Sequence, residues 1–179
     1  SYPLEGITVL VTRSQDQLAD AKSLFNAQGA IVCELPVLVI GPPDSWDPLD
    51  QALANWESFN WFVFSSSNGV KFVEERLNQL GKSLAKRPQD LKFATVGKKT
   101  ERHLRRLGTY VDFIPPNFVA DSLIDHFPTS QPGQKILLPR VQSGGRTLLP
   151  KAFAQMGFEV VEVAAYESSC PLSIPKETI

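Results

Sequence analysis

Near its middle the sequence reads Trp61-Phe62-Val63-Phe64-Ser65-Ser66-Ser67-Asn68-Gly69-Val70, an apolar run that ends in hydroxyl groups and a glycine. Trp61–Ser66 is rich in aromatic residues and too short for a helix, which is typical of a strand buried on both faces. Ser67-Asn68-Gly69 then predicts a turn into a helix that stops at Gly81. This stretch therefore predicts one βα unit of a parallel sheet.

The same unit recurs on both sides of this stretch. Further short apolar runs predict strands at residues 6–11, 30–35, 92–96, 110–114, 135–138 and 158–163. Helical spacing of apolar residues predicts helices at residues 14–28, 47–56, 98–107, 119–127 and 147–156, the second of them with Asp47 as its N-cap. Strands that alternate with helices of about ten residues predict right-handed crossovers and a parallel sheet. The predicted fold class is α/β.

Two segments do not fit a βα unit. Pro36–Pro43 and Ala164–Pro171 are expected to be extended, and prolines flank them. The chain between them holds five predicted strands, whereas residues 1–35 hold only two, too few for a stable sheet. Residues 6–13 also align with residues 133–140, either because a domain is duplicated or because any two βα units look alike. The pattern favours two domains, the first completed by chain beyond the second extended segment.

Composition excludes several classes of protein. The 179 residues carry a net charge of −1, which argues against nonspecific binding of nucleic acid or of an anionic membrane. A hydrophobic content of 42% is too high for a disordered chain. Two cysteines, Cys33 and Cys170, exclude a disulfide scaffold, and no apolar run is long enough to span a membrane. Ser1–Gly6 is not typical of a signal peptide, so we expect a cytoplasmic globular protein.

Motifs of several common enzyme classes are absent. Gly97-Lys98-Lys99-Thr100 resembles the end of a phosphate-binding loop, but Lys92 stands where that motif needs its first glycine. No strand is followed by GxGxxG, and nothing resembles GxSxG. His103 and His126 fall on predicted helices, where we interpret them as surface or hydrogen-bonded histidines. No spacing predicts a metal site, and no cofactor is expected.

Hydroxyl groups, glycines and arginines instead follow the predicted strands. In a parallel sheet the carboxyl ends of the strands meet at one edge, where ligands bind. The segments at that edge are Thr12-Arg13, Ser65–Asn68, Gly97–Thr100, Pro116-Asn117 and Arg140–Arg146. Several precede helix N-termini, which favour carboxylate or phosphate groups. Together they predict a ligand with several negative groups.

Simpler interpretations of these segments remain open. Ser66 and Ser67 suit N-capping as well as ligand binding. Gly144-Gly145 suits a flexible turn. Arg13, Arg140 and Arg146 could each be a solvated charge.

The ordered set of motifs resembles the uroporphyrinogen-III synthase family. The likeness is carried by Val11-Thr12-Arg13, Phe64–Val70, Val96–Thr100, Pro139-Arg140 with Gly145-Arg146 and Leu149-Pro150, and Val163–Glu167. The resemblance implies two flavodoxin-like parallel-sheet domains joined by two extended crossings. Domain one would comprise residues 1–36 with 167–179 and be incomplete in this chain. Residues 37–43 and 164–171 would be the crossings, and residues 42–164 a complete domain two.

The resemblance also implies a reaction and its residues. Enzymes of this family are lyases that close linear hydroxymethylbilane into uroporphyrinogen III, in the biosynthesis of haem, chlorophyll and sirohaem. The implied acid is Tyr166, and the implied binding residues for the eight substrate carboxylates are Arg13, Ser65, Ser66, Ser67, Asn68, Gly97, Lys98, Thr100, Arg140, Gly144 and Arg146. A monomer without cofactor or metal is implied, with a transient contact to hydroxymethylbilane synthase.

Two other functions fit the same residues. A flavodoxin-like FMN-binding protein would use Ser65–Gly69 as its phosphate loop. A non-enzymatic two-lobed module for a small acidic ligand would need only the arginines and the helix N-termini.

Overall fold

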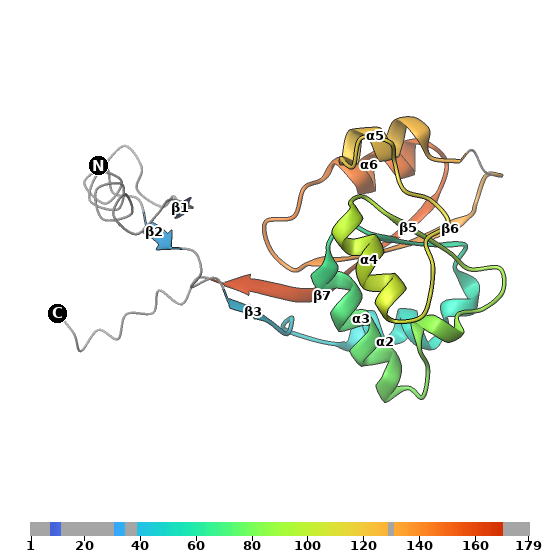
Figure 1. The fold of residues 1–179 in the computed structure, drawn as a ribbon, viewed down its shortest axis with the longest axis horizontal. Helices are drawn as coiled ribbons and strands as arrows, with labels where there is room; N and C mark the ends of the chain where they lie inside the picture. The colour runs from blue at the N-terminus through green and yellow to red at the C-terminus, as the bar shows by residue number, and fades with distance from the viewer. Residues whose placement is uncertain (1–7, 12–30, 35–38, 129–130, 170–179) are drawn as a thin grey trace. The chain divides into compact units, whose positions relative to one another are not determined.

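The fold was analysed in a computed structural model that describes residues 8–11, 31–34, 39–128 and 131–169. The chain divides into two compact units, one of Ser1–Gly41 with Ser168–Ile179 and one of Pro42–Glu167 (Figure 1). The predicted helix at residues 14–28 and Arg13 lie outside the described residues.

The described strands form two sheets. In the first, β1 (Thr8–Val11) pairs in parallel with β2 (Ile31–Glu34). The second has the strand order β3-β7-β6-β4-β5. Its members are β3 (Val39–Gly41), β4 (Trp61–Phe64), β5 (Lys92–Thr95), β6 (Lys135–Val141) and β7 (Glu159–Ser169). The pairings β4–β5, β4–β6 and β6–β7 are parallel, so the α/β prediction is confirmed.

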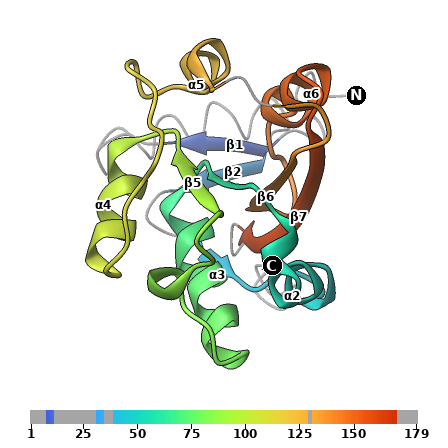
Figure 2. The same ribbon diagram turned by 90° about the vertical axis from the view of Figure 1, so that its right-hand side faces the viewer.

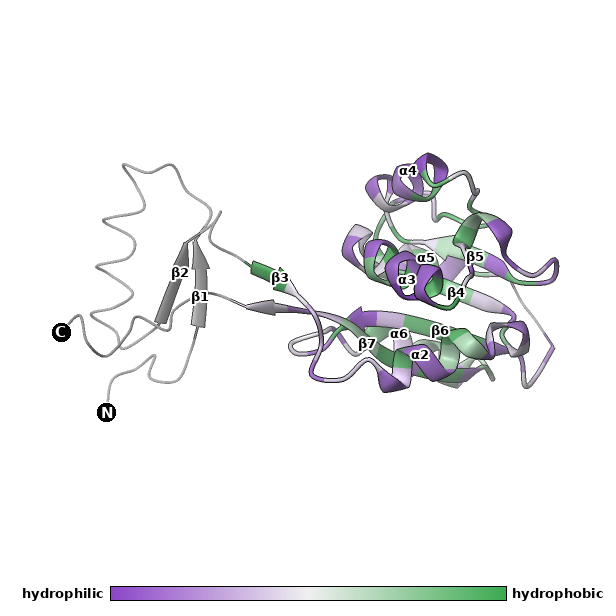
Figure 3. Ribbon diagram, turned by 90° about the horizontal axis from the view of Figure 1, so that it is seen from below, coloured by the Kyte–Doolittle hydropathy of each residue, from purple (hydrophilic) through white to green (hydrophobic). Residues whose placement is uncertain are grey.

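Helices cover both faces of the five-stranded sheet. They are α2 (Asp47–Ala54), α3 (Ser67–Gln79), α4 (Lys98–Arg106), α5 (Ala120–His126) and α6 (Leu148–Gln155), with short 3₁₀ turns at Trp56–Ser58 and Leu84–Lys86. Figure 2 shows α5 and α6 on one face and α2, α3 and α4 on the other. Hydrophobic residues gather on β4 and β6, whereas α3 and α4 present hydrophilic residues outward (Figure 3).

All four residues of β4 are buried, and alternate ones enter different cores. Trp61 and Val63 belong to the core beneath α5 and α6, with Phe127, the residue that follows α5, and Phe153 of α6. Phe62 and its neighbours Phe64 and Phe93 pack ring against ring, with centroids 5.7–6.2 Å apart. This two-sided burial explains why the strand sequence is continuously apolar.

The predicted strand at residues 110–114 is wrong, because only one bridge forms there, between Ala94 and Phe113. The Asp112 carboxylate accepts the Phe93 amide N–H at 2.8 Å, where a strand would offer a backbone carbonyl. The same carboxylate pairs with Arg87 at 2.8 Å. Backbone hydrogen bonds still join Asp112 and Phe113 to β5, but the side chain takes one ladder position and the pairing stops at a single bridge. The fifth strand is β3, from a segment predicted only as extended.

The predicted N-cap of α2 is also wrong, by one residue. Trp46 is the N-cap, because its carbonyl already accepts the Asp50 amide at 2.8 Å. Asp47 lies in the first turn, and its N–H is accepted by Ser45 Oγ at 3.2 Å. An acidic residue there still suits the helix dipole.

We expect Asp112→Ala to lower the free energy of unfolding by about 1–3 kcal/mol, because it leaves a buried N–H of Phe93 without its acceptor. It also removes the ion-pair partner of the nearly buried Arg87. Urea denaturation measures the change, with Asp90→Ala at an exposed aspartate as the control. Equal stability of the two variants would contradict this role of Asp112.

A side-chain contact also joins α3 to α4. Ser67, the first residue of α3, lies with its Oγ 2.7 Å from His103 Nδ1. Desolvation by burial lowers the pKa of His103 below its usual 6.5, and the charge of Arg106 lowers it further. The imidazole in this contact is therefore held in its neutral form.

The lowered pKa of His103 predicts a pH dependence of stability. As the pH falls through about 6.5, the unfolded chain binds this proton before the folded one does, so stability is lost. We expect His103→Asn to lose less stability than the parent between about pH 7 and pH 5.5. Urea denaturation at each pH tests this, and parallel curves for the two proteins would refute it.

Candidate functional site

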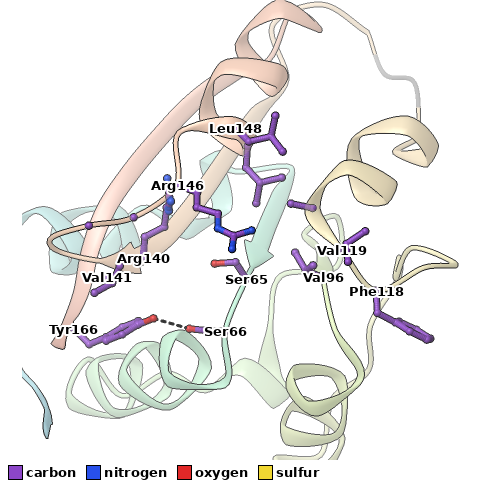
Figure 4. Close-up of a pocket in the computed structure, with 14 residues that line it drawn as sticks. Ser65, Ser66, Val96, Phe118, Val119, Arg140, Val141, Arg146, Leu148 and Tyr166 are labelled. Atoms are coloured by element: carbon purple, nitrogen blue, oxygen red, sulfur yellow. Dashed lines mark hydrogen bonds between the residues drawn. The ribbon is translucent and has the colours of Figure 1, made fainter. Parts of the chain in front are cut away.

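A cavity of about 430 Å³ opens at the carboxyl edge of the five-stranded sheet, within the Pro42–Glu167 unit (Figure 4). Its polar side is lined by six of the residues predicted from sequence: Ser65, Ser66, Arg140, Gly144, Arg146 and Tyr166. They meet because β4 and β6 carry the serines, arginines and glycine at or just after their carboxyl ends, and Tyr166 of the parallel strand β7 pairs with Val141, the last residue of β6. The volume lies in the range of about 300–1,000 Å³ that is usual for small-molecule sites.

Ser66 and Tyr166 form one corner of the cavity. Ser66 is the N-cap of α3, and its Oγ accepts the Gly69 amide N–H at 3.2 Å. The same oxygen lies 3.0 Å from the Tyr166 hydroxyl, as the dashed line in Figure 4 shows. The Tyr166 ring is stacked on Phe72 of α3, with centroids 6.1 Å apart and planes 12° apart. Helix α3 therefore contacts both the hydroxyl and the ring of this tyrosine.

Two arginines supply positive charge to the cavity. Arg140 is only 8% exposed, and its Nη1 donates to Glu162 at 3.0 Å. Arg146 is exposed and points toward Ser65 (Figure 4). Among the residues that the structure describes, no carboxylate lies within ion-pair distance of Arg146. Its charge is therefore available to an anionic ligand.

The loop of residues 142–146 is held against both Arg140 and β7. Gln142 and Ser143 donate to the Glu167 carboxylate at 3.0 and 2.8 Å. The loop turns at Gly144, whose φ of 76° is in the left-handed region. Gly145 then packs on the Arg140 guanidinium so closely that an added Cβ would lie 2.8 Å from Nη2. Gly144-Gly145, for which a flexible turn was the alternative to ligand binding, thus lies packed against the Arg140 guanidinium.

The opposite side of the cavity is apolar, and sequence reasoning missed it. It is lined by Val96, Phe118, Val119, Ala120, Leu148 and Leu149. Phe118, Val119 and Leu148 remain 40–51% exposed, which is unusual for large hydrophobic residues in one place. Phe118 has a φ of 47°, and its ring points away from the arginines, with Lys98 Nζ 4.8 Å from its centroid. The cavity therefore suits a flat apolar group that carries acidic substituents.

The remaining predicted site residues lie elsewhere. Ser67 contacts His103, and Asn68 lies in the first turn of α3, outside the cavity lining. Gly97 is the N-cap of α4, where Lys98 and the buried Thr100 form the first turn. Of the two serines for which capping was the alternative, Ser66 caps α3 and Ser67 does not.

The described ranges contain neither a cluster of metal-binding side chains nor a membrane-spanning helix. No group of three or more histidine, cysteine, aspartate or glutamate side chains is placed to hold a metal ion there. None of the helices in these ranges is long and apolar enough to cross a membrane.

We expect Gly145→Ala to displace the Arg140 guanidinium, because the new methyl group would overlap Nη2. Since the arginine tip can rotate, the free energy of unfolding should change by less than about 1 kcal/mol. The Nε–H NMR signal of Arg140 reports the displacement. Gly41→Ala, which meets nothing within 4 Å, is the matched control, and an unmoved Arg140 signal in Gly145→Ala would contradict the close packing.

Comparison with known proteins gives consistent results. A family model described as uroporphyrinogen-III synthase HemD matches residues 19–179. The chain is 44% identical over 177 residues to the uroporphyrinogen-III synthase of Synechococcus elongatus, covering 99% of this chain and 66% of that protein. It is 29% identical to the putative enzyme of Methanothermobacter thermautotrophicus, covering 90% of this chain and 62% of the relative. The chain thus spans slightly less than two thirds of the length of these curated relatives.

Solved structures show the same fold. A mutant uroporphyrinogen III synthase from Thermus thermophilus superposes with a TM-score of 0.63 at 20% identity, covering 91% of this chain and 63% of that one. A wild-type structure from the same organism gives a TM-score of 0.60 at 21% identity, with 91% and 62% covered. The mixed α/β fold with its five-stranded sheet is therefore shared with these proteins, and the family model covers most of the sequence. This chain belongs to the uroporphyrinogen-III synthase family.

Proposed function

We propose that this chain carries the reacting side of a uroporphyrinogen-III synthase, a lyase that cyclises hydroxymethylbilane to uroporphyrinogen III with loss of water and inversion of ring D. Besides family membership, the observation that carries the proposal is the two-sided cavity, with Tyr166, Ser66 and two arginines facing an apolar wall. A pyrrole ring with acetate and propionate substituents has the same division into a flat apolar body and acidic edges.

The charges of the cavity suit this substrate. Arg146 has no carboxylate partner among the described residues, and Arg140 shares its charge with the half-exposed Glu162. A guanidinium binds a carboxylate through paired N–H groups, which fixes orientation as well as position. The Ser65 hydroxyl is exposed at the same place and can donate a further hydrogen bond.

Tyr166 is the residue that we propose as the acid. The hydroxymethyl C–O bond of ring A breaks, its electron pair goes to oxygen, and the phenol proton joins that oxygen so that water leaves. The azafulvene cation that remains attacks the substituted position of ring D and forms a spiro intermediate. Fragmentation and recombination then close the macrocycle with ring D inverted. Holding the chain folded supplies most of the acceleration, since proximity and orientation need no strong base.

Eight carboxylates need more contacts than this cavity offers. We propose that Arg13, Ser67, Asn68, Gly97, Lys98 and Thr100 bind the parts of the substrate that extend beyond it. Gly97 and Lys98 support this assignment, because they follow Val96, which lines the cavity, and stand at the start of α4. The N-cap Gly97 has no side chain to accept the first N–H groups of the helix, so these donors are open to a carboxylate.

The larger assembly is also part of the proposal. We propose two flavodoxin-like domains, residues 1–36 with 167–179 and residues 42–164, joined by crossings at 37–43 and 164–171. The division of the chain into two compact units supports it. We further propose a cytoplasmic monomer without cofactor that receives its substrate from hydroxymethylbilane synthase in a transient contact.

The FMN-binding alternative has less support. A phosphate at Ser65–Gly69 would need free donors at the start of α3. Ser66 Oγ already accepts the Gly69 N–H, and Ser67 Oγ is engaged by His103. A colourless purified protein would agree with this, whereas bound flavin would favour the alternative.

The proposed function is tested by a coupled assay with freshly generated hydroxymethylbilane, in which the type I and type III isomers are separated after oxidation. The chain and the full-length protein are compared, with spontaneous cyclisation as the blank. We expect type III isomer from the full-length protein. Type I isomer alone from both proteins would contradict the proposed function and favour a non-enzymatic anion-binding module.

We expect Tyr166→Phe to lower kcat by about 100-fold, because it removes the proton donor while the ring keeps its stacking on Phe72. The Kd of uroporphyrinogen III should change by less than about tenfold, since one neutral hydrogen bond is lost. Single-turnover kinetics and equilibrium titration of the product separate the two quantities. An equal loss in both would leave Tyr166 as a packing residue.

A further inference from the structure

We propose that Ser66 is a positioning residue for Tyr166, whose hydroxyl it orients and to which it donates a hydrogen bond as the phenol gives up its proton. This inference rests on the proposed function and adds a role for a serine that the sequence predicts only as a helix cap or as a substrate-binding residue. It follows from the contacts that one oxygen makes with two different elements of the fold.

The position of Ser66 Oγ is fixed from the side of α3. As N-cap it accepts the Gly69 amide N–H at 3.2 Å, which holds its side chain in a single orientation. In that orientation it lies 3.0 Å from the Tyr166 hydroxyl on β7. The backbone of the helix therefore sets the place of the phenol through one intervening hydroxyl.

The hydrogen and the lone pairs of Ser66 determine which of the two hydroxyl groups can donate in this contact. A serine hydroxyl has one hydrogen to donate and two lone pairs. One lone pair of Ser66 takes the Gly69 N–H, so the contact with Tyr166 uses either the serine hydrogen or the second lone pair. If the phenol donates to Ser66, its proton points away from the substrate. If Ser66 donates to the phenol oxygen, the phenol proton is free to point into the cavity, and only this arrangement permits acid catalysis.

The same arrangement stabilises the product of proton transfer. When the Tyr166 proton has moved to the leaving oxygen, the phenolate keeps the hydrogen bond from Ser66, which strengthens because its acceptor is now charged. The positive end of α3, a helix of 13 residues, lies beside this group. The proton that the pyrrole carbon loses when the macrocycle closes returns to the phenolate through cavity water, so the acid is restored and the protons balance.

The arrangement also argues against Ser66 as a direct contact of the substrate carboxylates. With its hydrogen on Tyr166 and one lone pair on the Gly69 N–H, Ser66 has only a lone pair left, which repels a carboxylate. The neighbouring Ser65 is exposed and has the free hydroxyl for that contact. Substitution of Ser66 is thus expected to change kcat, and substitution of Ser65 to change KM.

The test uses three substitutions of Ser66 in the full-length protein. Glycine is a good N-cap and alanine a poor one, yet both lack the hydroxyl, whereas threonine keeps hydroxyl and cap. We expect kcat for type III isomer to fall about 10- to 100-fold in both Ser66→Gly and Ser66→Ala, and to recover in Ser66→Thr. Loss in Ser66→Ala alone, in parallel with its melting temperature, would mean that the serine only caps the helix.

Two further comparisons separate this role from substrate binding. In a Tyr166→Phe background, Ser66→Gly should lower kcat by less than about threefold, because the group it acts on is gone. Multiplicative losses would overturn the proposal, since Ser66 would then act on the substrate itself. Ser65→Ala is the neighbouring comparison, and it should raise KM more than it lowers kcat.

A spectroscopic readout is independent of activity. The chain has three tyrosines, so Tyr2→Phe with Tyr110→Phe leaves Tyr166 as the single phenol. The tyrosine Fermi doublet in ultraviolet resonance Raman reports whether a phenol donates or accepts a hydrogen bond. We expect the doublet to indicate an accepting phenol in the parent and to change in Ser66→Gly. An unchanged doublet would overturn the proposal.

These experiments distinguish failure of this inference from failure of the proposed function. A parent protein that forms no type III isomer would overturn the proposed function, and this role of Ser66 with it. An active parent whose Ser66→Gly variant keeps its kcat would overturn the role of Ser66 alone.

Discussion

The hydrogen bond from the Gly69 amide to Ser66 Oγ is the contact on which the site depends. It marks the point where β4 ends and α3 begins, and so fixes the first turn of the helix at the carboxyl edge of the sheet. The same oxygen lies beside the Tyr166 hydroxyl, and Phe72 of the same helix stacks on its ring. A capping interaction that many helices possess here also orients the residue that we propose as the acid.

The positive side of the cavity also depends on a contact of the backbone. Arg140 projects from the end of β6 and is largely withdrawn from solvent. The loop that follows closes over its guanidinium because Gly145 has no Cβ, and Glu167 next to Tyr166 anchors that loop. The loop over the arginine and the proposed acid are thus held by two neighbouring residues of β7, Glu167 and Tyr166.

An element can be predicted from the sequence when its own residues determine its structure. It cannot be predicted when a contact from elsewhere in the fold determines it. Strand β4 is predicted because its four residues are buried on both faces, and Ser66 and Arg140 because they stand at or after strand ends. Tyr166 is expected only from the family resemblance. The stretch at 110–114 has the composition of a strand, but the Asp112 carboxylate takes one ladder position and only a single bridge forms, which propensity does not register. Val119 and Leu148 were missed because an apolar residue before a helix looks the same whether it enters the core or lines a cavity.

We propose that the tetrapyrrole lies in the cavity of the Pro42–Glu167 unit, with carboxylates at the arginines and the reacting ring at Tyr166. The most direct measurement is an NMR titration of the isotope-labelled full-length protein with uroporphyrinogen III under reducing conditions. We expect saturable shifts of the side-chain signals of Arg140 and Arg146 and of the amides from Ser65 to Gly69. Saturable binding that leaves these signals unmoved while others shift would contradict it.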